Sequence, residues 1–489
     1  MLSSGRRLAR VSAAFLFLAL MCIPFADIEI YSVEPWTELT RMGQGLLHPN
    51  MNIGSVLWLA LAQTVAFALL AVAGSAAIGL CLAMVFQSRL VRAVCATSRA
   101  VHELFWGLIF MQFFGLSATT GLLAILVPFC GVFAKVYAEI LERQSRQPIA
   151  TVAVNSDRLS RYAYTLLPLA WPALVNYTRY RFECALRSST ILGFIGLPTL
   201  GFYLDTAFKQ GQYADAATLL LLFFGLIASL RFWFRPRYLV LYLLAAVYFL
   251  PSSPAVTGTS GWQFFSVDIW PQSVREGNWL QAWGWYQHQL VEVALPALVD
   301  TVLLSQLALV LSGLLALTCY GWASPQVLRG GWHRVGQALL LVLRSTPEMV
   351  FAFIVLLLVG PSGLPAIIAL ALHNGGLVAF LLASHSETLS LRTDAAKGVN
   401  RFLYELTPRL YPQMMALLLY RWEVILRESA ILGFLGITTL GFYIDSAFED
   451  IRYDRAFLLI AVAALLNLLV DSLARRVRRY CQLQSMSVS

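Results

Sequence analysis

Charged residues are scarce in this chain. Asp, Glu, Lys and Arg make up only 12% of the 489 residues, whereas hydrophobic residues make up 59% and the mean hydropathy is +0.70. A soluble protein carries roughly a quarter charged residues, so about half of the expected charge is absent. This deficit and the many long apolar runs argue against a soluble protein and favour a polytopic membrane protein.

Several motifs of enzymes and metal sites are missing. The seven cysteines show no C-x-x-C spacing, which supports neither a zinc site nor a disulfide framework and suits small apolar packing residues. No G-x-x-x-x-G-K-[ST], H-E-x-x-H or G-x-S-x-G sequence occurs, so the chain has no P-loop for ATP. We expect no enzyme activity, no metal and no cofactor within this chain.

The histidines give no sign of a metal or catalytic centre. They do not cluster in sequence with carboxylates, so we predict that they are structural: His102, His288, His333, His373 and His385.

The net charge of +9 is explained by membrane topology. The basic residues stand in short clusters between apolar runs, and short loops rich in Lys and Arg stay in the cytoplasm. No basic stripe interleaves with aromatics, so we expect no nucleic-acid partner. The clusters at the two ends predict that both termini are cytoplasmic: Arg6, Arg7 and Arg10, and Arg475, Arg476, Arg478 and Arg479.

One segment occurs twice, and the chain is organised around it. Residues 179–208 read RYRFECALRSSTILGFIGLPTLGFYLDTAF, and residues 419–448 read LYRWEVILRESAILGFLGITTLGFYIDSAF. The offset is constant, as for Glu183 and Glu423 (423 − 183 = 240). So long a period indicates two homologous halves, which we place at 1–236 and 237–489.

The apolar runs predict an all-α fold with about six spans in each half, about twelve in all. Because each half has an even number of spans, the halves enter the membrane in the same orientation, as parallel repeats about a pseudo-twofold axis. Residues 254–290 are rich in tryptophan, which favours membrane interfaces, so we predict an outer loop there.

Two charged pairs lie within the repeated segment. Glu183 and Arg187, like Glu423 and Arg427, are four residues apart, which puts both side chains on one helix face. Ionisable groups at membrane depth usually face the protein interior or a wet cavity. Two roles stay open: a self-neutralising structural pair, or arginines that favour an anion in a solute pathway.

Glycines and aromatic residues follow each charged pair. Glycines at these positions let helix backbones approach closely, so the ends of the repeat either pack or form a gate. The aromatic residues either form an apolar constriction or make ordinary lipid and core contacts. The candidate pathway or gate residues in this part are Gly193, Gly196, Tyr203, Gly433, Gly436 and Tyr443, with Phe194, Phe202, Phe434 and Phe442 beside them.

A polar loop precedes the second copy of the repeat. Residues 393–412 read TDAAKGVNRFLYELTPRLYP, in which Asp394 can open a short helix and Pro408 stops it. Such a helix is either a docking element for a partner or a plain connection.

These residues resemble a known family. The acid-Ala-Ala-x-Gly pattern of Asp394, Ala395, Ala396 and Gly398 is similar to the cytoplasmic loop signature of bacterial ATP-binding-cassette (ABC) importer permeases. The run LRSTPE at 343–348 and the segment YRWEVILRESAILGFLG resemble the phosphonate-transport type. The first half matches more weakly, with His102 where the second half has Pro347 and Thr151-Val-Ala-Val where Asp394-Ala-Ala would fall.

The resemblance implies two fused permease halves of the type I importer fold in a bacterial inner membrane, embedded in lipid. It implies coupling helices at 150–167 and 393–407, with Asp157, Arg161 and Arg401 among the contacts, docked on two copies of an ABC ATPase. Those partners would bind ATP and magnesium, and a periplasmic binding protein would deliver a small anion, most simply phosphonate or a related phosphorus oxyanion. The runs at 196–201 and 436–441 depart from the glycine-rich pattern common in the family.

Two alternatives remain. A secondary transporter with two parallel repeats would be driven by an ion gradient, with Glu183 and Glu423 carrying protons. A membrane enzyme or assembly scaffold has no catalytic constellation to support it.

Overall fold

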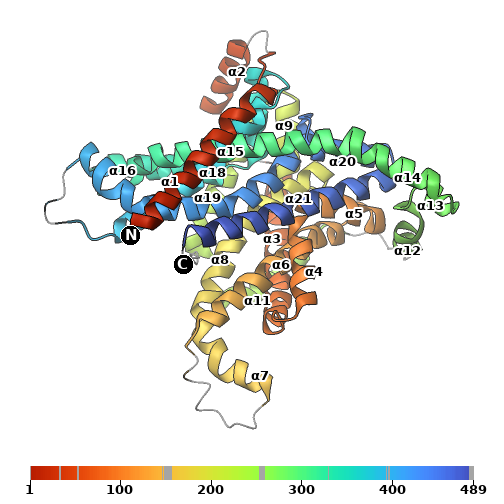
Figure 1. Ribbon diagram of the computed structural model, residues 1–489, viewed down its shortest axis with the longest axis horizontal. Coiled ribbons are helices and arrows are strands. Elements are labelled where there is room, and N and C mark those ends of the chain that lie inside the picture. Colours follow the sequence, from red (N-terminus) through yellow and green to blue (C-terminus); the bar gives the residue numbers. More distant parts are fainter. Residues whose placement is uncertain are drawn as a thin grey trace. The chain divides into compact units, whose positions relative to one another are not determined.

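The computed structural model describes most of the chain, and the described residues form helices and no strand. The described residues are 2–31, 35–51, 54–145, 147, 157–252, 259–328, 330–392, 394 and 397–483. Predictions that concern Ala395, Ala396 and the segment 151–154 fall outside them. Figure 1 shows the course of the chain, coloured from the N-terminus to the C-terminus.

The chain divides into two compact units that do not follow the boundary at 236/237. Unit 1 consists of Met1–Gly43 with Ser266–Met486, and unit 2 is Gln44–Phe265. The halves assigned from the repeat stay a prediction about ancestry, while the units describe how the helices pack.

Unit 2 is built around the parallel pair α3 and α6. Its helices are α3 (Ser55–Met84), α4 (Arg89–Ala100), α5 (Glu103–Phe114), α6 (Ala118–Arg143), α7 (Arg158–Arg161), α8 (Leu167–Ile191), α9 (Leu200–Lys209), α10 (Tyr213–Trp233), α11 (Leu239–Phe249) and α12 (Thr259–Gln263). Helices α4, α5 and α8 pack on α6, and α8 also packs on α3. One side of α3 is buried, and its buried residues are mostly small, including Ala68 and Ala71. Small side chains let α6 come close.

Unit 1 repeats this plan around α15 and α18. Its helices are α1 (Leu2–Cys22), α13 (Gln272–Arg275), α14 (Trp279–His288), α15 (Leu295–Ala323), α16 (Trp332–Ser345), α17 (Glu348–Val359), α18 (Leu364–Thr388), α19 (Thr407–Ser429), α20 (Leu440–Glu449) and α21 (Tyr453–Tyr480), and the unit boundary falls within α2 (Pro35–Leu47). Helices α16, α17 and α19 pack on α18, and α19 packs on α15 and α21. The duplication seen in the sequence is therefore a duplication of packing.

Each unit includes the first helix of the other half of the sequence. Helix α1, from the first half, packs on α15, and Ser12 on α1 accepts a hydrogen bond from the Tyr411 hydroxyl on α19 at 2.7 Å. Helix α11, from the second half, packs on α3. The two first helices have thus been exchanged between the halves.

The prediction of an all-helical membrane protein is confirmed, but a count of twelve spans is not. Among the described residues, seven helices are long and apolar enough to cross a membrane, or up to ten if each of three bent pairs is one span. The helices Glu103–Phe114 and Pro236–Phe249 are apolar but short. At 1.5 Å per residue they do not reach across a hydrocarbon core of about 30 Å.

The sharpest bend lies at Pro347, between α16 and α17, where the axis turns by 93°. The residue before a proline avoids the helical region, and Thr346 is extended with ψ 127°. The apolar run 336–360 therefore forms two helices at an angle, not the single straight span expected from hydropathy.

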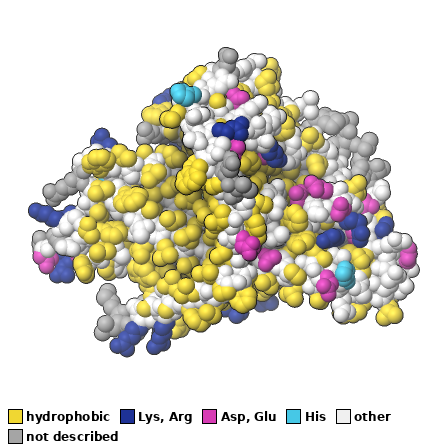
Figure 2. Space-filling model, turned by 90° about the horizontal axis from the view of Figure 1, so that it is seen from above, with side chains coloured by type: hydrophobic (Ala, Val, Ile, Leu, Met, Phe, Trp, Pro, Cys, Tyr) yellow, Lys and Arg dark blue, Asp and Glu magenta, His cyan; other side chains and the backbone are white. Residues whose placement is uncertain are grey.

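The tryptophan-rich region is more helical than expected. Instead of one loop over 254–290, the described part contains α12, α13 and α14, and α14 continues through a π-helical turn into α15 as one 45-residue helix, Trp279–Ala323. Trp279 and Trp283 remain exposed, as expected for interfacial residues. The left part of the face drawn in Figure 2 is a broad hydrophobic area with few charged side chains within it, as a lipid-facing surface requires, while charged side chains are more frequent on the right part.

Candidate functional site

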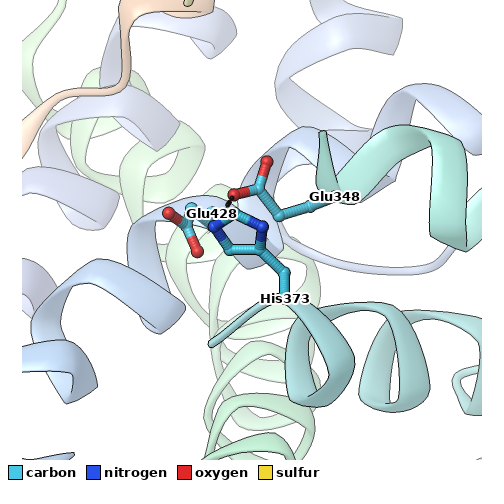
Figure 3. A group of neighbouring side chains, drawn as sticks. All are labelled: Glu348, His373 and Glu428. Atoms are coloured by element: carbon cyan, nitrogen blue, oxygen red, sulfur yellow. Dashed lines mark ion pairs between the residues drawn. The ribbon is translucent and has the colours of Figure 1, made fainter. Parts of the chain in front are cut away.

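A buried polar cluster lies at the bend in unit 1. Glu348 opens α17, His373 lies in the middle of α18, and Glu428 lies near the end of α19. Figure 3 shows the three side chains converging from separate helices. The His373 Nε2 atom lies 3.0 Å from Glu348 Oε1, and the His373 side chain has no solvent exposure. Three helices are thus joined at one point inside the apolar part of the chain.

Asn374 and Arg421 extend the cluster. The Asn374 amide donates to Glu428 Oε2 at 3.1 Å, and Arg421 Nε donates to Asn374 Oδ1 at 2.6 Å. Arg421 Nη2 lies 3.5 Å from Glu428 Oε1. Because Arg421 and Glu428 are seven residues apart, they occupy one face of α19. The Asn374 amide therefore links α18 to α19 by two hydrogen bonds, and the ion pair lies within α19.

His373 has an oxygen atom facing each ring nitrogen. Its Nδ1 atom faces the Thr346 carbonyl at 3.0 Å while Nε2 faces the Glu348 carboxylate. The ring therefore joins α18 to both sides of the bend between α16 and α17.

The same three residues have the donor types of a metal site. One ligand atom from each of Glu348, His373 and Glu428 lies within 4.8 Å of the others, and imidazole with carboxylates suits zinc. Arg421, however, already brings a positive charge to Glu428. That neighbour disfavours a second cation, and the expectation of no metal stays a prediction.

Unit 2 holds the equivalent glutamate in another way. Glu103 opens α5 and corresponds to Glu348 (348 − 103 = 245). His102 Nε2 lies 2.9 Å from Glu103 Oε2, and the Ser188 hydroxyl donates to Glu103 Oε1 at 3.3 Å. His102 Nδ1 accepts from the Leu104 amide at 3.1 Å, so here one ring nitrogen accepts and the other donates. This arrangement suits a neutral imidazole.

Two histidines contact carboxylates. His102 is adjacent to Glu103, so the statement that no histidine clusters in sequence with a carboxylate is wrong there, whereas His373 and Glu348 are far apart in the sequence (373 − 348 = 25) and meet only in the fold. That the histidines are structural stays a prediction. An alignment of the two halves at the offset of 245 would have given a signal, because it pairs Glu103 with Glu348. At the same offset His102 is paired with Pro347, and Pro128 is paired with His373. Each half therefore has a histidine beside the shared glutamate, but at a different position of the repeat.

The predicted charged pairs lie in the chain about one helical turn before the breaks that end α8 and α19. Glu183 and Arg187 are half-buried on α8, and Glu423 and Arg427 are half-buried on α19. The helices carry both members of each pair on one face, as the spacing predicts. Their roles as structural or solute-contacting groups stay predictions.

The glycines that follow these pairs are required by close backbone packing in both units. A Cβ on Gly201 would collide with the Thr190 carbonyl, and a Cβ on Gly441 would collide with the Ala430 carbonyl. Gly193 and Gly433 meet the next helix in the same way. The packing interpretation thus has direct support, and a gate remains compatible with it.

Gly196 and Gly436 end the 3₁₀ turns η4 (Leu192–Ile195) and η9 (Ala430–Leu435) in the left-handed conformation, with φ of 90° and 82°. Glycine adopts that conformation without steric cost. After each turn the chain bends, by 55° in unit 2 and by 47° in unit 1, into a helix whose first residues carry matching ring pairs. Phe202 with Tyr203, and Phe442 with Tyr443, have ring centroids 5.4 Å apart.

A threonine from the central helix caps that following helix in each unit. The Leu200 amide donates to Thr64 Oγ1, and the Leu440 amide donates to Thr301 Oγ1, both at 2.9 Å. These hydrogen bonds satisfy an amide that has no partner within its own helix. The helix after the break is thereby fixed to α3 or α15.

Each of the two polar loops ends, in its described part, in a π-helical turn that leads into the following helix. Asp157 caps α7 by accepting from the Ser160 amide at 3.2 Å, and Arg161 begins the π-helical turn that leads into α8. In the second loop Arg401 Nη1 donates to the Gln326 carbonyl at 2.9 Å, and Gly398 has φ 62°. Asp394 is an exposed residue that pairs with Arg392 at 3.1 Å.

Each loop presents one tyrosine to solvent at the same repeat position. Tyr164 is 81% exposed and Tyr404 is 79% exposed (404 − 164 = 240). An exposed aromatic ring at the tip of a short helical turn is well suited to enter a pocket on a partner.

Comparisons with known proteins agree with this architecture. Residues 322–480 match the family of binding-protein-dependent transport system inner membrane components. The phosphate-import permease protein PhnE of Mycolicibacterium smegmatis is 23% identical over 79% of this chain and 77% of its own length. No solved structure matches the chain.

Two shorter relatives match as well. The phosphite transport system permease protein PtxC of Stutzerimonas stutzeri is 28% identical over 37% of this chain and 69% of its own length. The putative cryptic phosphonate transport system permease protein PhnE2 of Escherichia coli is 30% identical over 23% of this chain and 92% of its own length. Such relatives are transport subunits rather than enzymes, and the matched family is one of inner membrane components. With its duplicated helix breaks and its all-helical units, the chain belongs to the permease family of ABC importers, in the phosphonate-type branch.

Proposed function

We propose that the chain forms the solute pathway for a small phosphorus oxyanion, such as a phosphonate, phosphite or phosphate. The observation that carries this proposal is the repeated break that ends α8 and α19, where a charged pair, a glycine crossing and a ring pair recur in the same order. The relatives, whose names refer to phosphate, phosphite and phosphonate transport, supply the solute class.

The electrostatics of the repeated segments suit such a solute. Arg187 and Arg427 keep their charge at any physiological pH and present a planar fork that matches an oxyanion. Glu183 and Glu423, one turn away on the same faces, lower the cost of burying those arginines and keep the anion from binding too tightly. The adjacent residues would form the pathway or its gate: Gly193, Gly196, Tyr203, Gly433, Gly436 and Tyr443.

The energy would come from partner subunits. Because the chain has no P-loop, ATP and magnesium would be bound by two copies of an ABC ATPase. The loops that hold Asp157, Arg161, Asp394, Gly398 and Arg401 would dock on them, with Tyr164 and Tyr404 as the protruding contacts. A binding protein outside the membrane would deliver the solute.

An uptake assay tests this function. Cells that express the chain with its neighbouring genes would be supplied with labelled phosphonate, phosphite or phosphate, and uptake would be measured after ATP depletion and, separately, after an uncoupler at constant ATP. We expect uptake to depend on ATP, and to fall in the variant Arg187→Gln with Arg427→Gln while the complex still assembles.

A matched control removes two exposed arginines that lie outside the repeat, as Arg235→Gln with Arg237→Gln. That variant should transport normally. Uptake that collapses with the uncoupler alone would instead establish an ion-gradient transporter, with Glu183 and Glu423 as the proton carriers, and would overturn the proposal.

A further inference from the structure

The first and last helices of the described chain meet at their basic ends in unit 1. Arg7 Nη1 donates to the Tyr480 carbonyl at 3.3 Å, and the Arg7 guanidinium lies 5.5 Å from the centre of the Tyr480 ring. Burial raises the pKa of the adjacent Cys481 thiol, and the charge of Arg7 acts in the opposite direction. The N-terminal end of α1 and the C-terminal end of α21 therefore form one surface.

This surface carries six arginines, which we call the basic terminal patch: Arg6, Arg7, Arg10, Arg476, Arg478 and Arg479. The next arginine, Arg475, is excluded because it pairs with Asp471. Among the residues that the structure describes, no ion pair joins Arg6, Arg10, Arg476 or Arg478 to a carboxylate. The positive charge of the patch is thus available to an outside anion.

Apolar stripes run from the patch along both helices. On α21, Leu465, Leu469 and Leu473 are exposed at intervals of four, and Arg476 continues the same face. On α1 the exposed face runs from Arg6 and Arg10 through Ala13 to Phe17 and Leu20. Each stripe is charged at one end and apolar along the rest. It therefore complements a phospholipid, which has a charged headgroup and apolar acyl chains.

We propose that the basic terminal patch binds the phosphate headgroup of an anionic phospholipid, whose acyl chains lie along the exposed faces of α1 and α21. Arginines at the membrane surface bind anionic lipids with a contribution that corresponds to about fivefold in affinity for each side chain. Their planar forks bind phosphate oxygens in pairs. A free phosphate ion would use the arginines but would gain nothing from the apolar stripes.

This site lies outside the solute pathway and does not depend on the proposed function. Its partner is the membrane itself, and its effect is to fix the ends of two helices that the sequence places 473 residues apart. Because α1 has few buried residues along its apolar part, a bound lipid would also supply packing that the protein does not.

Native mass spectrometry of the purified full-length chain tests the proposal. The chain would be titrated with cardiolipin and with inorganic phosphate, and bound adducts would be counted. The test variant is Arg6→Gln, Arg10→Gln, Arg476→Gln and Arg478→Gln combined. The control removes the same charge from exposed arginines in unit 2, as Arg89→Gln, Arg92→Gln, Arg235→Gln and Arg237→Gln.

We expect the affinity for cardiolipin to fall by about fivefold for each arginine removed in the test variant, and to change much less in the control. Phosphate should form no comparable adduct. Equal loss in both variants would show only a general charge effect, and phosphate adducts that compete with cardiolipin would identify a free-ion site. Either result would overturn the proposal. A melting temperature of the test variant near that of the wild type, measured without lipid, excludes misfolding.

Discussion

Unit 1 and unit 2 hold the same glutamate at the same helix break, but with different partners. Glu348 meets a histidine from the facing helix α18, close to Glu428, Asn374 and Arg421. Glu103 meets the histidine that precedes it and the hydroxyl of Ser188.

Backbone features, in contrast, are the same in both units. The glycine crossings, the left-handed glycines and the threonine caps recur at matching positions. The difference teaches that the bent scaffold was retained after duplication while its polar contacts diverged. The family match, which covers 322–480 only, falls on the unit with the larger polar cluster.

The largest effect should come from breaking the cluster in unit 1. Glu348→Ala should destabilise the chain by about 3 kcal/mol or more, because the fully buried His373 ring loses its carboxylate partner and the removed side chain leaves a cavity. Glu103→Ala should cost less, because Glu103 meets the residue that precedes it and a hydroxyl rather than a histidine of a facing helix. Thermal unfolding of the detergent-solubilised chain measures both. Glu348→Gln, which keeps the shape, serves as the control, and equal losses in the two units would contradict the comparison.

The glycine crossings should respond equally in the two units. Gly441→Ala and Gly201→Ala each force a Cβ onto a backbone carbonyl, so each should cost about 1–3 kcal/mol or more. Gly225→Ala is the matched control, since a Cβ there meets nothing within 4 Å. A loss confined to one unit in the same unfolding assay would show that the scaffolds are not equivalent.

The threonine caps should give a smaller, again equal, effect. Thr301→Val and Thr64→Val each leave a helix amide without its acceptor, at a cost of about 1 kcal/mol. Thr318→Val, whose exposed hydroxyl bonds only within its own region of α15, should change stability much less. Hydrogen exchange of the Leu200 and Leu440 amides offers a local measurement, and unchanged protection in both variants would argue against the caps.

The smallest effect on stability should come from the exposed tyrosines. Tyr404→Ala and Tyr164→Ala should alter stability by no more than about 0.5 kcal/mol. If the proposed coupling holds, ATP-driven uptake falls in both variants and more for Tyr404, whose loop keeps the family signature. Tyr248→Ala, equally exposed on α11, should transport normally. Normal uptake in the Tyr404 variant would mean that docking uses other residues.

Local patterns in the sequence predicted the helical membrane fold and the duplication. Apolar runs and basic clusters act over one span, and the repeated segment is visible without a structure. Hydropathy failed where the backbone turns inside an apolar run, as at Pro347, because a window average does not register a bend.

The polar cluster could not be read from spacing, because Glu348, His373 and Glu428 come from three helices. The repeat alignment gave a partial signal in the exchange of His102 and Pro347. The environment of His373 needed the fold, since both ring nitrogens find oxygen atoms only after α16, α17 and α18 have packed.

The exchange of α1 and α11 has a consequence for assembly. A polypeptide that ended at residue 236 would leave α3 without α11, and one that began at 237 would leave α15 without α1. Neither product could complete its own helical bundle. Two separate polypeptides would each have to supply a helix to the other before either bundle was complete. Joining them in one polypeptide guarantees that both donors are made together and in equal number.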